Sequence, residues 1–233
     1  MTDDNLRQLQ KTLGVTFNDT TILREALTHS SYVNENPSAI ANERLEFVGD
    51  AVLGLILAEK LFQDYPHCAE GELTKMRSQL VCCASLATIA NTFDLGNYLY
   101  LGRGEAASGG RKKPANLAGA MEAIFAALYL DRDWQGTREC VVRIFGSELA
   151  RIKYEQHGAD YKSLLQESLQ HRFKTTPSYR IVAEVGPDHN RLFTAEVMLD
   201  KTVLASGTGP SKKLAETEAA RMALESMDKK TSL

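Results

Sequence analysis

The chain has few of the features that mark membrane, secreted or zinc-binding proteins. No apolar run approaches the roughly 20 residues that a transmembrane helix needs, and the first residues, MTDDNLRQLQ, are polar and acidic, unlike a secretory signal. No histidine or cysteine cluster has metal-ligand spacing, and the cysteines are only Cys68, Cys82, Cys83 and Cys140. We therefore expect a cytoplasmic protein with no membrane contact and with reduced, mostly packed thiols.

Positive charge is not in excess either. The chain has 27 Lys and Arg against 30 Asp and Glu, which gives a net charge of −3. The total charge therefore does not indicate a nucleic-acid partner, and such a partner must be argued from where individual cations lie. What is present, 43% hydrophobic and 24% charged residues over 233 positions, is typical of a globular protein of one or two domains.

The chain changes character near residue 155. Before that point, apolar residues recur with the 3.6-residue period of amphipathic helices. This pattern predicts helices over 21–33, 43–62, 71–94, 116–131 and 134–152. We therefore expect an all-α domain over residues 1–153.

The remainder of the chain combines helices with strands. A helix is predicted over 160–171 and another over 211–227, with alternating apolar and polar residues between them. This alternation predicts three strands, near 178–185, 191–199 and 202–209. The order is that of a small α-β-β-β-α domain over 160–229, joined to the first domain by a short polar linker over 154–159. The expected fold class is α+β.

Three carboxylates interrupt the otherwise apolar segment NERLEFVGDAVLGL (42–55). Glu43, Glu46 and Asp50 fall within an arc of roughly 60° on a helix, so they share one face. For Glu43 alone, a solvated helix face is as good an interpretation as a functional site. Asp50 stands among apolar residues, where an ionised group is costly unless its charge is compensated, and this favours a functional acid.

A second segment repeats this oddity. Glu122 is the only charged residue in NLAGAMEAIFAALYL (116–130). Two helices that each present inward carboxylates can pack so that the oxygens converge. An all-oxygen site of this kind suits Mg²⁺ or Mn²⁺.

These residues also carry a family resemblance. NERLEFVGDAVL (42–53) is similar to the signature segment of the ribonuclease III family, and EGELTKMRSQLV (70–81) resembles the segment that follows it. LGRGEAASGGRKKPANLAGAMEAIFAALYLD (101–131) resembles the second acidic region of that family. The α-β-β-β-α part is similar to a double-stranded-RNA-binding domain, most clearly in GTGPSKKLAETEAARMAL (207–224). The resemblance spans nearly the whole chain in the expected order.

The resemblance implies a homodimeric, metal-dependent endonuclease that cuts both strands of an RNA duplex. Its products would have 5′-phosphate and 3′-hydroxyl ends, and its substrates would be ribosomal and other structured precursor RNAs. By motif position, Glu46 and Glu122 would be metal ligands, with Asp50 also essential in the metal site and Glu43 and Glu70 as accessory catalytic acids. The implied cofactor is Mg²⁺, for which Mn²⁺ can substitute. Metal ions held by carboxylates supply the hydroxide and the charge neutralisation that phosphodiester hydrolysis needs.

Two positions near these acids leave alternatives open. The resemblance makes Phe47 part of the dimer contact, but core packing explains an apolar residue there equally well. Family members usually carry an aspartate three residues before the second essential glutamate, where this chain has Gly119. Glycine supplies no side-chain oxygen. Either a water completes the coordination, another acid substitutes, or metal affinity and rate are reduced.

Local placement in the C-terminal domain favours duplex RNA as the partner. A-form RNA displays its 2′-hydroxyls in a wide, shallow minor groove. A polar helix face suits this groove, the turn GPDHN would reach the next minor groove, and GPSKK begins a helix whose N–H groups and cations suit phosphates. The expected RNA-binding residues are Ser163, Gln166, Glu167, Gln170, His189, Ser211, Lys212 and Lys213.

Two other functions compete with the nuclease hypothesis. A double-stranded-RNA-binding protein with weakened or lost cleavage is supported by Gly119 alone. An all-α interaction scaffold would leave Asp50 and Glu122 unexplained. Cleavage of a labelled RNA duplex with and without Mg²⁺ distinguishes the nuclease from the binding protein. Failure to bind duplex RNA at all would be needed to favour the scaffold.

Overall fold

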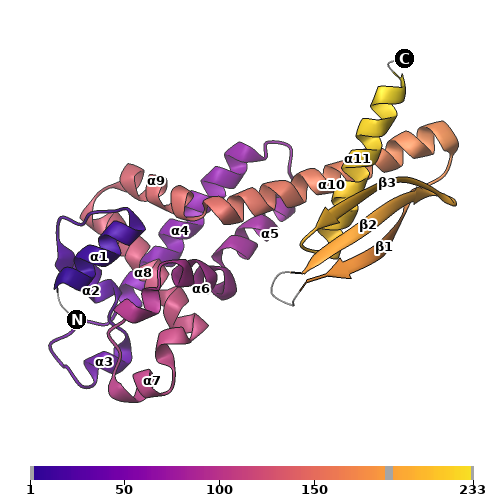
Figure 1. Cartoon of the computed structure of the whole chain (residues 1–233). Helices are drawn as coiled ribbons and strands as arrows, with labels where there is room; N and C mark the ends of the chain where they lie inside the picture. Colours follow the sequence, from indigo (N-terminus) through magenta and orange to yellow (C-terminus); the bar gives the residue numbers. More distant parts are fainter. Residues whose placement is uncertain (1–2, 187–190, 232–233) are drawn as a thin grey trace. The chain divides into compact units, whose positions relative to one another are not determined.

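The computed structural model describes residues 3–186 and 191–231 and divides the chain into two compact units (Figure 1). The first unit, Met1–Leu149, is helical, and the second, Ala150–Leu233, contains a three-stranded sheet with helices. The α+β fold class is therefore confirmed. Among the described residues, no helix is both long enough and apolar enough to cross a membrane.

The helices of the first unit follow one another with short connections. In chain order they are α1 (Asp3–Leu13), α2 (Thr20–Ala26), α3 (Ser30–Val33), α4 (Glu43–Asp64), α5 (Glu70–Val81), α6 (Cys83–Thr92), η1 (Leu95–Tyr98), α7 (Arg103–Ala107), η2 (Gly110–Lys112), α8 (Pro114–Asp131) and α9 (Trp134–Ile144). The next helix, α10 (Gly146–Phe173), begins in this unit and ends in the second.

Helices α4 and α8 form the centre of the first unit, where they pack against each other more extensively than any other pair. One face of α4 is buried through Leu53, Ile56 and Leu57, among others. In α8, every residue of 117–128 is buried except Glu122. A helix that is apolar on all sides belongs in a core, so the sequence of α8 accounts for its central place.

The second unit is an antiparallel sheet covered by two helices. Strands β1 (Ser178–Val185), β2 (Leu192–Leu199) and β3 (Thr202–Gly209) lie in the order β1-β2-β3. The end of α10 and α11 (Lys212–Thr231) pack on the sheet around a buried cluster. This core consists of Leu165, Leu169, Val197, Ala219, Ala220 and Ala223.

The strand register fixes where the ends of the sheet lie. Phe193 pairs with Gly209, whereas Leu199 pairs with Thr202 at the other end. The start of α11, which follows β3, is therefore at the end of the sheet where β2 begins. The turn around Lys201, which joins β2 and β3, lies at the opposite end.

Several predicted elements differ from the observed ones. The helices predicted over 21–33, 71–94 and 134–152 are each broken, near Thr28, Cys82 and Phe145 respectively. The stretch 154–159, predicted as a polar linker, lies within helix α10. The domain limits 1–153 and 160–229 stay predictions.

The four cysteines are free thiols with unequal exposure. Cys140 is buried and Cys68 is partly buried, but Cys82 and Cys83 are exposed. The expectation of mostly packed thiols is therefore wrong for Cys82 and Cys83. Their position at the junction between α5 and α6, where Cys82 has extended backbone angles, takes both away from the core.

Candidate active site and RNA-binding surface

The acids of α4 and α8 meet where glycine allows the two helices to approach closely. A Cβ atom on Gly49 would lie 1.9 Å from the backbone oxygen of Glu122, so only glycine fits there. A Cβ atom on Gly119 would lie 2.6 Å from Oε2 of Glu46. The carboxylate of Glu46 thus lies against the backbone of α8, one helical turn from Glu122. The sequence pattern indicated Gly119 but not Gly49, although a glycine between two site acids is a visible signal.

The electrostatics of these residues show that they form one group. Burial and the negative charges of Glu46 and Asp50 raise the pKa of Glu122 to about 7. Burial raises the pKa of Glu46, with Glu43 adding to the rise and His29 opposing it. Negative charge is therefore concentrated between α4 and α8, and a cation placed there would relieve it.

The remaining predicted acids are exposed. Glu43 and Asp50 both lie on the solvent side of α4, and Glu70 is the first residue of α5, where its Oε1 accepts a hydrogen bond from Thr74 at 3.0 Å. The expectation that Asp50 sits in a buried surround is wrong, because its side chain lies on the side of α4 where Phe47 and Ala51 are exposed, although Val52 and Leu53 are buried. The charge of Asp50 acts on the pKa of Glu122, and the charge of Glu43 acts on the pKa of Glu46. The hydrogen bond of Glu70, in contrast, lies within its own helix.

The donor set fits a hard divalent cation in its chemistry. Glu46, Asp50 and Glu122 offer oxygen atoms only, which suits Mg²⁺ and Mn²⁺. Within residues 3–186 and 191–231, however, no three or more acidic, histidine or cysteine side chains already have the geometry to hold a metal ion. A cation bound here would draw further ligands from water and from a bound substrate, as Mg²⁺ commonly does.

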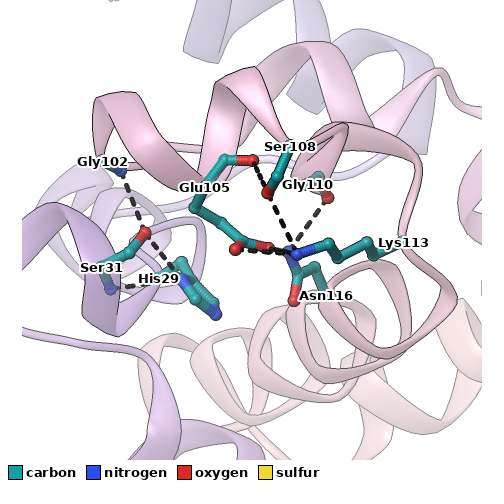
Figure 2. A network of polar contacts seen from close by, with 8 residues as sticks. All are labelled: His29, Ser31, Gly102, Glu105, Ser108, Gly110, Lys113 and Asn116. Atoms are coloured by element: carbon teal, nitrogen blue, oxygen red, sulfur yellow. Dashed lines mark hydrogen bonds and ion pairs between the residues drawn. The ribbon is translucent and has the colours of Figure 1, made fainter.

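A polar network supports the first turn of α8, as Figure 2 shows. The Glu105 carboxylate accepts hydrogen bonds from Nζ of Lys113 at 2.9 Å and from Nδ2 of Asn116 at 2.8 Å. Asn116 also donates to the carbonyl of Gly110 at 3.0 Å. These contacts, led by the Lys113 hydrogen bond, lower the pKa of Glu105. The network fixes α8 one helical turn before Gly119, and the sequence alone had not indicated it.

His29 lies beside this network with its ring orientation fixed. Its Nδ1 accepts a hydrogen bond from the backbone N–H of Ser31 at 3.2 Å and lies 2.8 Å from the hydroxyl of the same residue. The hydroxyl of Ser31 accepts from the backbone N–H of Gly102 at 3.0 Å (Figure 2). A charge on His29 lowers the pKa values of both Glu46 and Glu105, so the ring is electrostatically coupled to the acids and to the network.

One face of α4 is apolar yet exposed. Phe47 is 79% exposed, Leu55 58% and Phe62 71%. We call these residues the exposed apolar face of α4. A pocket beside it is lined by Ile22, Glu25, Glu43, Arg44, Leu45, Phe47, Val48 and Leu130. Core packing of Phe47 within one protomer, one of the two interpretations of this residue, is therefore wrong.

The predicted RNA-binding residues of the second unit are accessible where they are described. Ser163, Gln166, Glu167 and Gln170 are exposed on α10, and a pocket there is lined by Gln166, Glu167, Ser168, Gln170, His171, Arg172 and Lys174. At the start of α11, Lys212 and Lys213 are exposed. The Ser211 hydroxyl accepts a hydrogen bond from the N–H of Leu214 at 3.2 Å, which makes Ser211 the N-cap. His189 lies outside the described residues.

Comparison with known proteins agrees with this two-part organisation. A family model described as Ribonuclease-III-like matches residues 19–148, and one described as Double-stranded RNA binding motif matches residues 161–227. The curated Ribonuclease 3 of Dehalococcoides mccartyi is 52% identical over 96% of this chain and 95% of that protein. The Ribonuclease 3 of Natranaerobius thermophilus is 44% identical over 95% of this chain and 96% of that protein.

A solved structure gives the same result for the nuclease part. The nuclease domain of ribonuclease III from Campylobacter jejuni aligns with a TM-score of 0.58 and 37% identity, over 61% of this chain and 97% of that chain. That structure is described as showing structural flexibility in a region involved in dimer formation. Together with the acids between α4 and α8, these matches establish that the chain belongs to the ribonuclease III family of double-stranded-RNA endoribonucleases.

Proposed function

We propose that the chain is a divalent-metal-dependent endoribonuclease that hydrolyses duplex RNA to 5′-phosphate and 3′-hydroxyl ends. Its substrates are structured precursor RNAs, ribosomal RNA among them. The observation that carries this proposal is the coupled group of Glu46, Asp50 and Glu122 at the close contact between α4 and α8. Such concentrated negative charge disfavours an RNA phosphate unless a cation is present.

In this proposal the acids of the site have two roles: three of them hold the metal ion, and two are accessory acids. Glu46, Glu122 and Asp50 hold Mg²⁺ or Mn²⁺, which when bound supplies an activated water and neutralises charge on the phosphate. Glu122, with its raised pKa, must lose its proton before it can hold a cation. Glu43 and Glu70 are exposed and act as accessory acids on the surface that the RNA approaches.

The second unit supplies sequence-independent affinity for the duplex. The exposed polar side chains of α10 suit the 2′-hydroxyls of a minor groove. The N-terminus of α11, with the backbone N–H groups of its first turn and the cations of Lys212 and Lys213, suits phosphates. His189 completes this proposed surface by sequence position alone.

A second copy of the chain covers the exposed apolar face of α4. Three large apolar side chains that are more than half exposed on one helix are typical of an interface rather than of free surface. The adjoining pocket, lined partly by Ile22, Val48 and Leu130, offers a complementary apolar surface to Phe47 of another copy. The likeness to a nuclease domain whose description mentions dimer formation supports a homodimer.

The test is cleavage of an end-labelled RNA duplex in Mg²⁺, in Mn²⁺ and in EDTA, with the single strand of the same sequence as control. We expect cutting of the duplex only, and only with a metal. The products should be substrates for a 5′-phosphate-dependent exonuclease and for polymerase extension from the 3′-hydroxyl. Duplex binding without cutting in either metal would favour the alternative, an RNA-binding protein that has lost cleavage.

A further inference from the structure

Gly119 holds open the space that the Glu46 carboxylate occupies. A Cβ atom at Gly119 would lie 2.6 Å from Oε2, 2.9 Å from Cδ and 3.3 Å from Oε1 of Glu46. All three distances are shorter than ordinary van der Waals contact. Any side chain at this position would therefore move the carboxylate of Glu46 away from the backbone of α8.

The glycine is not required by the backbone of the helix. Gly119 lies inside α8, and its backbone conformation is one that other residues adopt, since it is not among the positive-φ glycines of the described residues. Glycine in a helix interior costs roughly 0.5–1 kcal/mol relative to alanine. The position next to Glu46, rather than local geometry, accounts for its presence.

We propose that Gly119 is a positioning residue that seats the Glu46 carboxylate beside Glu122, in the space that a side chain at position 119 would fill. This inference rests on the proposed metal-dependent function and concerns how this chain builds that site without the usual aspartate. The carboxylate of Glu46 reaches from α4 into the space that an aspartate on α8 would fill.

The proposal is tested by direct Mn²⁺ binding to the RNA-free full-length protein, measured by electron paramagnetic resonance of the free ion. Gly119→Ala displaces Glu46 without adding an oxygen, and Gly119→Asn does so with a larger neutral side chain. Both should weaken Mn²⁺ binding by about 10-fold or more, as loss of a ligand's correct orientation does in metal sites. Gly119→Asp, which matches asparagine in shape but restores a carboxylate, should bind within a few-fold of the parent protein.

A double-variant cycle separates action through Glu46 from a general effect on the helix. In the Glu46→Gln background, Gly119→Ala should cost little further Mn²⁺ affinity, because the carboxylate that it would displace is already gone. An equal loss in both backgrounds would overturn the proposal. Parent-like binding by Gly119→Ala, or equally weak binding by the Asp and Asn variants, would do the same.

The control variant for effects on folding replaces a glycine that has room for a side chain. At Gly146, at the start of α10, an added Cβ atom would have nothing within 4 Å, so Gly146→Ala should bind Mn²⁺ like the parent. Circular dichroism and urea unfolding in EDTA show whether each variant is folded. If a position-119 variant unfolds, Glu46→Asp supplies the test, because its shorter side chain leaves Gly119 intact and should still weaken Mn²⁺ binding by about 10-fold. Absence of Mn²⁺ binding and cutting in the parent protein would instead defeat the proposed function.

Discussion

At the scale of single residues, the surroundings of Glu122 change its pKa. Burial, followed by the charges of Glu46 and Asp50, raises its pKa from the ordinary glutamate value of 4.5 to about 7. Between pH 4.5 and about pH 7, Glu122 keeps its proton in the folded, metal-free protein but has released it in the unfolded chain. The folding stability contributed by this group is therefore present below pH 4.5 and is lost as the pH rises through about 7.

This linkage predicts a pH dependence that Glu122→Gln removes. In EDTA, the parent protein should lose more stability between pH 5 and pH 8 than the variant does, by on the order of 1–2 kcal/mol after allowance for partial exposure. Urea unfolding at the two pH values measures this. Groups other than Glu122 titrate in both proteins, so the difference between them isolates this residue. Parallel pH profiles would contradict the prediction.

The same substitution should separate chemistry from binding. Gln keeps the shape of Glu122 but removes a charge that holds the metal, so duplex cleavage in Mg²⁺ should fall by at least about 100-fold, or about 2.7 kcal/mol in the barrier. Affinity for the duplex should change by less than about 2-fold, because the cations that we propose as phosphate contacts, Lys212 and Lys213, lie in the second unit. Glu139→Gln, on the exposed side of α9, is the matched control. Turnover near the parent rate would remove Glu122 from the site.

The sequence patterns predicted the surroundings of some site residues correctly and those of others wrongly. Glu122 was predicted to face the acids of another helix, and the charges of Glu46 and Asp50 on α4 do raise its pKa, although it is the one position of 117–128 that is not buried. Asp50 was expected to be enclosed because its neighbours are apolar, but α4 is apolar on two faces and only one of them is buried. Periodicity cannot tell a face that packs within the chain from one that does not. Gly49 was missed because its importance depends on the backbone of another helix.

At the scale of helices, the contact between α4 and α8 depends on Gly49. In Gly49→Ala the new methyl group would meet the carbonyl oxygen of Glu122, which as backbone cannot turn away. The two helices must separate, and we expect a loss of about 1–3 kcal/mol in the free energy of unfolding. Gly71→Ala in α5, where nothing lies within 4 Å, should be neutral or slightly stabilising. Equal stability of the two variants in urea would contradict the close contact.

The N-terminus of α11 carries a second prediction at this scale. Replacing both Lys212 and Lys213 with alanine should weaken binding to unrelated duplexes alike and reduce the salt dependence of the binding constant by about 2 in slope. Binding titrations at several salt concentrations measure this. The control is Lys201→Ala, which removes a cation at the opposite end of the sheet. An unchanged slope in the double variant would exclude these lysines as phosphate contacts.

The order of elements followed from the sequence, whereas several helix breaks did not. The three strands occur where alternation predicted them, and β1 and β3 have the predicted bounds. The break near Thr28 has a tertiary cause: the backbone of 27–29 hydrogen-bonds to Tyr100 and Asn42 rather than continuing a helix. At Phe145 the chain turns between α9 and α10 while the ring packs against Phe125 in the core. Such partners, distant in sequence, leave no local signal.

At the scale of the whole molecule, the exposed apolar face of α4 predicts a dimer. Phe62→Asp places a charge on that face, and analytical ultracentrifugation should then show a monomer where the parent protein is a dimer. Phe173→Asp, which alters another exposed phenylalanine on a different helix, should leave the dimer intact. A parent protein that sediments as a monomer, or a Phe62→Asp dimer, would show that the face has another use.

The pairing of α4 with α8 also bears on how the chain is made. The buried face of α4 is complete once Asp64 has been synthesised, but its partner begins only at Pro114. At about 5–20 residues per second, a ribosome takes about 2–10 s to add the chain between them. For that interval the nascent helix has an uncovered apolar stripe on each of two sides. One of them packs later against α8, and the other is the exposed face for which we propose a second polypeptide as partner. Slower translation between these positions would lengthen the time during which a nascent chain is open to aggregation or chaperone capture.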